Sequence, residues 1–248
     1  MKLTELVDYT GQLLDATRFR DYGPNGLQVE GKQELNRLVT GVSASLRLLE
    51  AAADLHADAV LVHHGWFWKS EDVRVVGVKR KRMAFLMQHD MSLIGYHLPL
   101  DAHLDLGNNV LLGKKLGLEI DDWFGEQRIA AHGRLAQPKS LGLFCADVEI
   151  ALQRKPFVVG EFEKTIRRIA WCSGAAQDYL AQAVELGVDA FLTGEVSEHT
   201  VHLARESGVA FIAAGHHATE RYGVQALGQH LAQRFSLQHE FIDIDNPI

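Results

Sequence analysis

The chain has 248 residues, of which 47% are hydrophobic and 23% charged, so it has the composition of a globular protein long enough for one large domain or two modest ones. Its formal net charge of −7 disfavours general binding to nucleic acid or to anionic membranes. No apolar run reaches the roughly 18 residues of a membrane span, and the first residues are too polar and acidic for a signal peptide, so we expect a cytoplasmic protein without a membrane partner.

The first half of the chain alternates between predicted strands and helices. Apolar spacing predicts an opening helix over residues 3–17, and turn-forming residues follow at 22–26. Predicted strands then cover residues 38–42, 59–62 and 92–96, and predicted helices cover residues 46–55 and 83–88. This alternation is typical of an α/β fold with a parallel sheet.

The same order of elements returns after residue 166. Predicted strands cover residues 169–172, 190–192 and 209–213, and predicted helices cover residues 179–186 and 201–206. Residues 52–59 also align with residues 183–190, so that Asp58 matches Asp189. We interpret the repeat as an internal duplication. The alternative is that helix-to-strand connections of unrelated α/β units look alike.

The segment between the two halves contains a predicted strand at residues 129–135 and a predicted helix at 141–153, without a long linker. We expect two similar α/β domains, residues 1–126 and residues 127–248, with the C-terminal segment as a candidate to pack on the first half. Cys145 and Cys172 both lie in apolar surroundings, so we expect buried free thiols rather than a disulfide.

Polar residues follow predicted strands of the first half at their carboxyl ends, which is where open α/β sheets bind ligands. His63 and His64 directly follow the buried strand that ends at residue 62. His97 and Asp101 follow the next strand along the sequence. Pro99 between them predicts a loop rather than a helix.

Similar residues follow the strands of the second half. His216 and Glu220 come after the strand at 209–213, and they would share one face of a helix beginning near His216. Glu195 follows the preceding strand, in the position that His63 and His64 hold in the first half. Because the His97–Asp101 and His216–Glu220 pairs have the same spacing and place in the repeat, we expect a metal site in a cleft between the two domains.

Imidazoles and carboxylates without a thiolate are suitable ligands for Zn²⁺, Mn²⁺, Fe²⁺, Co²⁺ or Ni²⁺. The predicted metal ligands are His63, His64, Asp101, His216 and Glu220. They are enough for two divalent ions per chain with positions left open for water, an arrangement that supports metal-assisted hydrolysis. The alternative is that these groups are ordinary core or surface residues with structural hydrogen bonds.

Two further residues are candidates for catalytic roles. His97 would bind a metal ion directly or through a bridging water, or it would orient a metal ligand without contacting the ion itself. Glu195 would act as a general base, or it would be a carboxylate stabilised by a helix N-terminus. Aromatic residues 66–68 would stack on a planar base, or they would pack in the core or at a subunit contact. Basic residues 79–82 would hold a substrate phosphate, or they would form a solvated helix start.

These histidine and carboxylate motifs, with residues 25–31 and Thr193-Gly194-Glu195, resemble the NIF-three-like family of GTP cyclohydrolase 1 type 2 homologues over essentially the whole chain. The resemblance implies a dinuclear metal site between two α/β domains, held by the ligands named above. It also implies a ring-shaped homohexamer.

The function that we expect is that of a dinuclear metal protein, with hydrolysis of a nucleotide-like or other small substrate as the first hypothesis. The second hypothesis is a metal carrier or cofactor-assembly protein without turnover. The sequence leaves open whether the protein is an enzyme and which metal it binds. It predicts a small-molecule substrate and no nucleic-acid partner.

Overall fold

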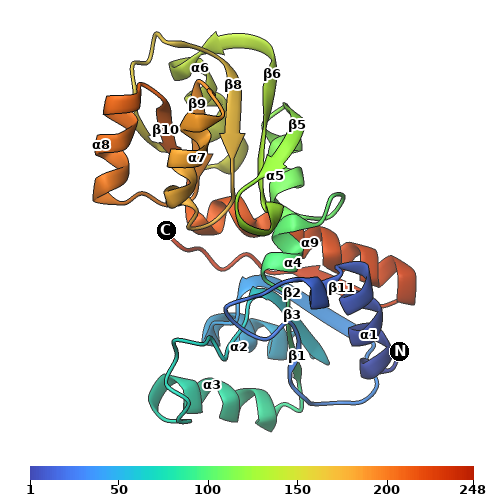
Figure 1. Ribbon diagram of the computed structural model, residues 1–248. Helices are drawn as coiled ribbons and strands as arrows, with labels where there is room; N and C mark the ends of the chain where they lie inside the picture. Colours follow the sequence, from blue (N-terminus) through green and yellow to red (C-terminus); the bar gives the residue numbers. More distant parts are fainter. The chain divides into compact units, whose positions relative to one another are not determined.

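The computed structural model describes residues 1–248, which divide into two compact units (Figure 1). Unit 1 comprises Met1–Leu106 and Gly223–Asp245, and unit 2 comprises Gly107–Tyr222 and Asn246–Ile248. Helix α9 (His216–Phe235) contributes residues to both units. No helix combines the length and the apolar character needed to cross a membrane.

Unit 1 is built on a five-stranded sheet with the order β1-β4-β3-β2-β11. The strands are β1 (Gly26–Val29), β2 (Arg37–Ser43), β3 (Ala59–His64), β4 (Ser92–Gly95) and β11 (Gln238–Phe241). All neighbouring pairs are parallel except β1 with β4. The α-helices that lie wholly in this unit are α1 (Leu3–Leu13), α2 (Leu46–Asp54), α3 (Gly77–Gln88) and α4 (Leu98–Ala102).

The sheet of unit 1 is buried on both faces. Leu38, Leu61 and Ile94 pack into one apolar cluster together with residues of α1 and α9. Their neighbours in the strands, such as Val60 and Leu93, point to the opposite face and pack against α2. Burial on both faces explains why these strands are continuous apolar runs in the sequence.

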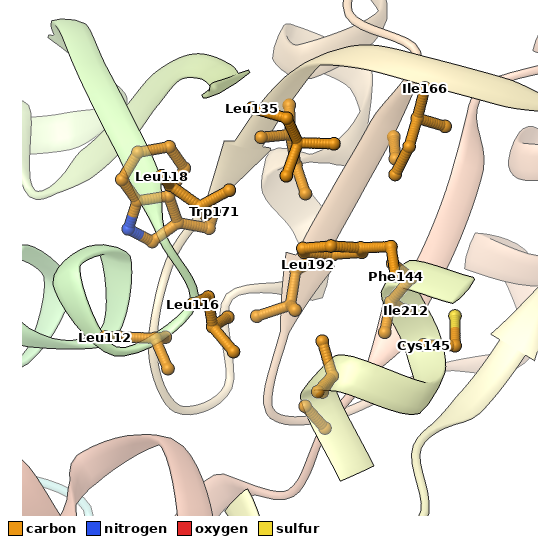
Figure 2. Packing of buried hydrophobic residues seen from close by; sticks show 14 of the residues in the cluster. Leu112, Leu116, Leu118, Leu135, Phe144, Cys145, Ile166, Trp171, Leu192 and Ile212 are labelled. Atoms are coloured by element: carbon orange, nitrogen blue, oxygen red, sulfur yellow. The ribbon is translucent and has the colours of Figure 1, made fainter. Parts of the chain in front are cut away.

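Unit 2 contains a six-stranded sheet with the order β5-β6-β8-β9-β10-β7. The strands are β5 (Leu118–Phe124), β6 (Ala130–Ser140), β7 (Phe157–Val159), β8 (Thr165–Trp171), β9 (Ala190–Thr193) and β10 (Ala210–Ala213). Only β8, β9 and β10 are parallel to one another. The α-helices that lie wholly in unit 2 are α5 (Asn108–Lys115), α6 (Leu141–Leu152), α7 (Leu180–Glu185) and α8 (Glu198–Ser207). Trp171, Leu192 and Ile212 pack against Phe144 of α6 on one face of the sheet (Figure 2).

The two units repeat one arrangement, as the sequence predicts. In each, three parallel strands alternate with helices, and the third strand has an antiparallel edge partner that precedes the repeat: β1 beside β4, and β7 beside β10. The carboxylate of Asp58 accepts hydrogen bonds from the backbone N–H groups of Asn36 and Arg37 at 2.8 and 3.0 Å. The carboxylate of Asp189 accepts the matching pair from Arg167 and Arg168, each at 2.8 Å.

The structure differs from the sequence analysis in two places that bear on the site. Residues 98–102 form helix α4 rather than a loop, because Pro99 lies in the first turn, where no intrahelical N–H bond is lost. Unit 1 ends at Leu106 rather than near residue 126, because β5 pairs with β6 and so belongs to unit 2. Both cysteines are buried thiols that form no disulfide, as expected.

Candidate metal-binding groups

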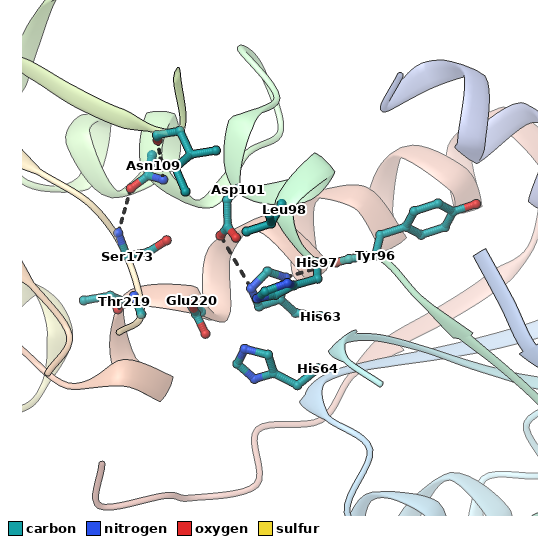
Figure 3. Close-up of polar contacts among 12 residues, drawn as sticks. His63, His64, Tyr96, His97, Leu98, Asp101, Asn109, Ser173, Thr219 and Glu220 are labelled. Carbon is teal, nitrogen blue, oxygen red and sulfur yellow. Dashed lines mark hydrogen bonds and ion pairs between the residues drawn. The ribbon is translucent and has the colours of Figure 1, made fainter. Parts of the chain in front are cut away.

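His63 and His64 form the end of β3 in unit 1. The side chain of His63 is fully buried, and its Nδ1 donates to the backbone carbonyl of Tyr96 at 3.0 Å (Figure 3). That hydrogen bond places the lone pair of the neutral ring on Nε2, which lies 3.5 Å from Oδ1 of Asp101. His64 is half-buried, and its Nδ1 lies 3.1 Å from the hydroxyl of Ser43.

His97 lies at the N-terminus of α4, four residues before the buried Asp101. Its ring is 5.1 Å from that of His63 and 5.6 Å from that of His64, measured between centroids. One potential ligand atom from each of these three rings lies within 4.8 Å of the other two. Unit 1 therefore brings together all of its predicted site residues.

Asp21 is a buried carboxylate that the sequence analysis missed. It lies 2.7 Å from Nδ1 of His97, and it accepts hydrogen bonds from the amide of Asn25 and from the backbone N–H groups of Tyr22 and Leu98. Burial alone would raise the pKa of Asp21, but the interaction with His97 and the other hydrogen bonds outweigh burial and lower it to about 2. The ionised carboxylate holds the His97 ring in one orientation.

The candidate group of unit 2 lies at the start of α9. Nε2 of His216 is 3.1 Å from Oε2 of Glu220, which is almost fully buried one turn further along the helix. Nδ1 of His216 is 2.7 Å from Oε1 of Glu195. Burial would lower the pKa of His216, but the carboxylates of Glu220 and Glu195 outweigh it and raise the pKa to about 9.

Two glycines allow the backbone to approach this pair closely. A Cβ atom on Gly174, which has φ +67°, would run into Oε1 of Glu220 and lie 3.2 Å from Nε2 of His216. A Cβ atom on Gly194 would lie 2.7 Å from Cα of His216. Gly194 donates its N–H to the carbonyl of Gly174 at 2.8 Å, so the segments that follow β8 and β9 are joined next to His216. A lone glycine after a strand gives no local signal of this role, and the sequence analysis did not find it.

The four imidazoles share one pattern of hydrogen bonding. Each engages Nδ1 with a protein oxygen: a carbonyl for His63, a hydroxyl for His64, and a carboxylate for His97 and His216. Metal-binding histidines usually show this arrangement, in which a hydrogen bond fixes one ring nitrogen and the other ring nitrogen binds the ion. Together with the buried carboxylates, this donor set fits a divalent transition metal.

The strand register corrects one part of the predicted repeat. The N–H of Tyr96 donates to the carbonyl of Val62, and the N–H of Ala214 donates to the carbonyl of Thr193. Tyr96 in unit 1 is therefore equivalent to Ala214 in unit 2, and Val62 is equivalent to Thr193. His97 is therefore equivalent to Gly215 rather than to His216. Glu195, in contrast, is equivalent to His64, as predicted. Its carboxylate pairs with His216 rather than with the N-terminus of α8.

The chain matches the model of the Duf34/NIF3 (NGG1p interacting factor 3) family over residues 1–247. It is 54% identical over 244 residues to a GTP cyclohydrolase 1 type 2 homolog of Allochromatium vinosum, covering 98% of this chain and 96% of the relative. A relative with the same name in Pseudomonas aeruginosa is 54% identical over 248 residues, with 99% and 98% covered.

Solved structures resemble the whole chain. A protein named ybgI, described as of unknown function, is 46% identical with a TM-score of 0.96, and both chains are covered completely. The crystal structure of a Thermus thermophilus protein is 31% identical with a TM-score of 0.90, again at 100% coverage of both chains. With the family model matching nearly every residue and these relatives matching at full length, the chain belongs to the Duf34/NIF3 family.

Proposed function

We propose that this protein binds two divalent metal ions per chain and uses them to hydrolyse a nucleotide-like or other small substrate. The ligands in this proposal are His63, His64 and Asp101 of unit 1 and His216 and Glu220 of unit 2. The observation that carries it is the shared hydrogen-bonding pattern of the imidazoles, in which a protein oxygen engages Nδ1 of each ring, while Nε2 of His63 and of His216 lies 3.5 and 3.1 Å from a buried carboxylate oxygen.

Burial of the carboxylates supports the same reading. Asp101 and Glu220 are nearly inaccessible, and each has an oxygen within 3.5 Å of a histidine Nε2. Taking a carboxylate out of water is costly unless a cation or hydrogen bonds compensate it. A divalent ion bound to imidazole and carboxylate would add to the compensation that neighbouring groups give these carboxylates.

The remaining residues of the two groups would position and transfer protons. When bound, the ions would lower the pKa of a coordinated water and polarise substrate oxygens. His97, held by the ionised Asp21, would take up or deliver a proton beside the ligands of unit 1. Glu195 would hold the ring of His216 in the orientation that directs Nε2 to the ion.

Hydrolysis can be tested with metal-loaded protein and a panel that includes GTP, other nucleotides and simple phosphoesters. We expect turnover of at least one compound, with loss of more than 100-fold in Asp101→Ala and of about 100-fold in His97→Gln, as for removal of a general acid–base group. His89→Gln, an exposed histidine of unit 1, is the matched control and should retain turnover. Metal-loaded wild type that turns over nothing would contradict the hydrolase and favour the metal carrier.

A further inference from the structure

The loop after His64 divides its aromatic residues between two environments. Trp66 is buried, and its indole N–H donates to the carbonyl of Ala44 at 2.9 Å. Trp68 is only half-buried. Phe67 between them has φ +66°, a left-handed conformation that is costly for a bulky residue and is kept where the surroundings require it. The loop therefore uses Trp66 to anchor itself and leaves Trp68 beside the histidines.

Trp68 and Tyr22, here called the aromatic pair, both lie against His97. The ring of Trp68 is 5.0 Å from that of His97 at an interplanar angle of 87°, and the ring of Tyr22 is 6.2 Å away at 61°. Trp68 also lies 6.1 Å from the ring of His64. Two aromatic side chains from different loops thus border His97, and Trp68 also borders the predicted metal ligand His64.

Hydrogen bonds join the two loops that carry the aromatic pair. Lys69 donates its N–H to the carbonyl of Tyr22 at 2.8 Å and its ammonium group to the carbonyl of Asp21 at 2.6 Å. The indole of Trp68 rests on Gly23, where a Cβ atom would lie 3.3 Å from the ring. Because both loops are fixed before any ligand arrives, binding at the pair would cost little ordering entropy.

Tyr22 is 61% exposed although it lies next to buried polar groups. The cavity that Trp68, His97, His63 and Gln28 line has a volume of only about 10 Å³, which suffices for one water-sized group. A ring would therefore lie on the outer surface of the aromatic pair, and a small polar substituent could reach the cavity beside His63. Flat, amphipathic aromatic surfaces next to a few fixed polar groups are typical of sites for planar ligands.

We propose that Trp68 and Tyr22 bind the planar heterocyclic ring of the substrate beside His97. This rests on the proposed function and names the chemical class of substrate that the site would accept. Stacking on an indole recognises any flat π-system and does not distinguish closely among bases. Packing of the pair against another protein surface is the competing interpretation, and it predicts no affinity for a free base.

The test compares nucleoside monophosphates with ribose 5-phosphate, which lacks only the base, by isothermal titration calorimetry on metal-loaded protein. We expect at least one nucleotide to bind ten times or more tightly than ribose 5-phosphate. Trp68→Ala and Tyr22→Ala should each weaken nucleotide binding by roughly tenfold or more and leave ribose 5-phosphate unchanged. Trp68→Phe retains an aromatic face and should recover most of the affinity.

Metal content measured in the same samples separates this proposal from the proposed function. The aromatic variants should retain wild-type metal content, and Phe162→Ala, an exposed aromatic of unit 2, should bind nucleotide normally. The proposal is overturned if no nucleotide binds more tightly than ribose 5-phosphate, or if both aromatic variants bind nucleotide as the wild type does. Absence of metal from wild-type protein would instead contradict the proposed function.

Discussion

Orientation of the imidazoles depends on residues that would not themselves contact an ion. Glu195 holds Nδ1 of His216, and Asp21 holds Nδ1 of His97, each at 2.7 Å. Such outer carboxylates fix the ring and increase the basicity of the ligating nitrogen. The affinity of the His216–Glu220 pair for metal should therefore depend on Glu195, and proton transfer by His97 should depend on Asp21.

Replacement of Glu195 by Gln keeps the size of the side chain and removes its charge. We expect metal affinity at the His216–Glu220 pair to fall by roughly 10- to 100-fold, measured by competition with a chelator of known affinity. Glu198→Gln is the matched control, because Glu198 also pairs with a histidine but on the exposed surface of α8. Equal affinities of Glu195→Gln and wild type would show that Glu195 has no orienting role.

Gly174→Ala tests the close packing of the backbone against the His216–Glu220 pair. The new Cβ atom would collide with Oε1 of Glu220, so we expect weaker metal binding and a lower melting temperature. Gly208→Ala is matched in backbone strain, since its φ of +73° is similar to the +67° of Gly174, but nothing lies within 4 Å of its Cβ position. If both variants lose metal to the same extent, backbone strain rather than the collision is the cause.

The candidate ligands could be proposed from the sequence because the segments that carry them follow buried apolar runs that end at the ligand edge of a sheet. Asp21 and Gly174 could not be found in this way. Asp21 lies in a turn region where acidic residues are common, and its partner His97 is distant in sequence. Their roles arise only from the tertiary contacts that the fold brings about.

At the scale of the elements, the same carboxylate contact occurs within each unit, where Asp58 or Asp189 binds backbone N–H groups at the start of a strand or next to it. The carboxylate of Asp58 accepts hydrogen bonds from the ammonium group of Lys32 and from the backbone N–H groups of Asn36 and Arg37, next to and at the start of β2. Burial by itself would raise the pKa of Asp58, but these hydrogen bonds outweigh it, and the pKa is lowered. A carboxyl with a lowered pKa in the folded state stabilises the fold only while it is ionised.

Asp58→Asn should accordingly reduce the free energy of unfolding by about 1–3 kcal/mol at neutral pH. The contribution of Asp58 is complete above the unfolded pKa of about 3.9 and is lost as the pH falls through the lower folded value. Unfolding in urea should thus show a difference in the free energy of unfolding between wild type and variant at pH 7, and this difference should shrink below about pH 4. Asp54→Asn, on the exposed surface of α2, should show no difference. A difference for Asp58→Asn that is the same at pH 3 and pH 7 would contradict this account.

The repeated elements were predictable because parallel strands buried on both faces are continuous apolar runs. The edge strands β1 and β7 were not predicted. β7 has only three residues, and β1 has a half-buried pattern beside turn residues. Helix α4 was missed because Pro99 is excluded from helix interiors but is tolerated in a first turn.

At the scale of the whole molecule, the chain is a duplicated α/β protein of the Duf34/NIF3 family. The duplication was predictable from the aligned segments, whereas the limits of the units depend on long-range pairing. The C-terminal strand β11 pairs with β2, which returns residues 223–245 to unit 1. Such pairing between distant segments has no signal in local sequence.

The hexamer implied by the family resemblance remains a prediction. Light scattering after size-exclusion chromatography should give a mass six times that of the 27.6 kDa chain. A mass equal to that of one chain, independent of protein concentration, would exclude the hexamer.

Binding of metal by both units is the central claim, and elemental analysis of purified protein tests it most directly. Wild type, Asp101→Ala of unit 1 and Glu220→Ala of unit 2 would be compared, with Asp105→Ala as an exposed carboxylate control. We predict about two transition-metal ions per chain in wild type and in the control, with a clear loss in both ligand variants. Wild type that contains almost no metal even after reconstitution, or ligand variants with the full content, would contradict the account.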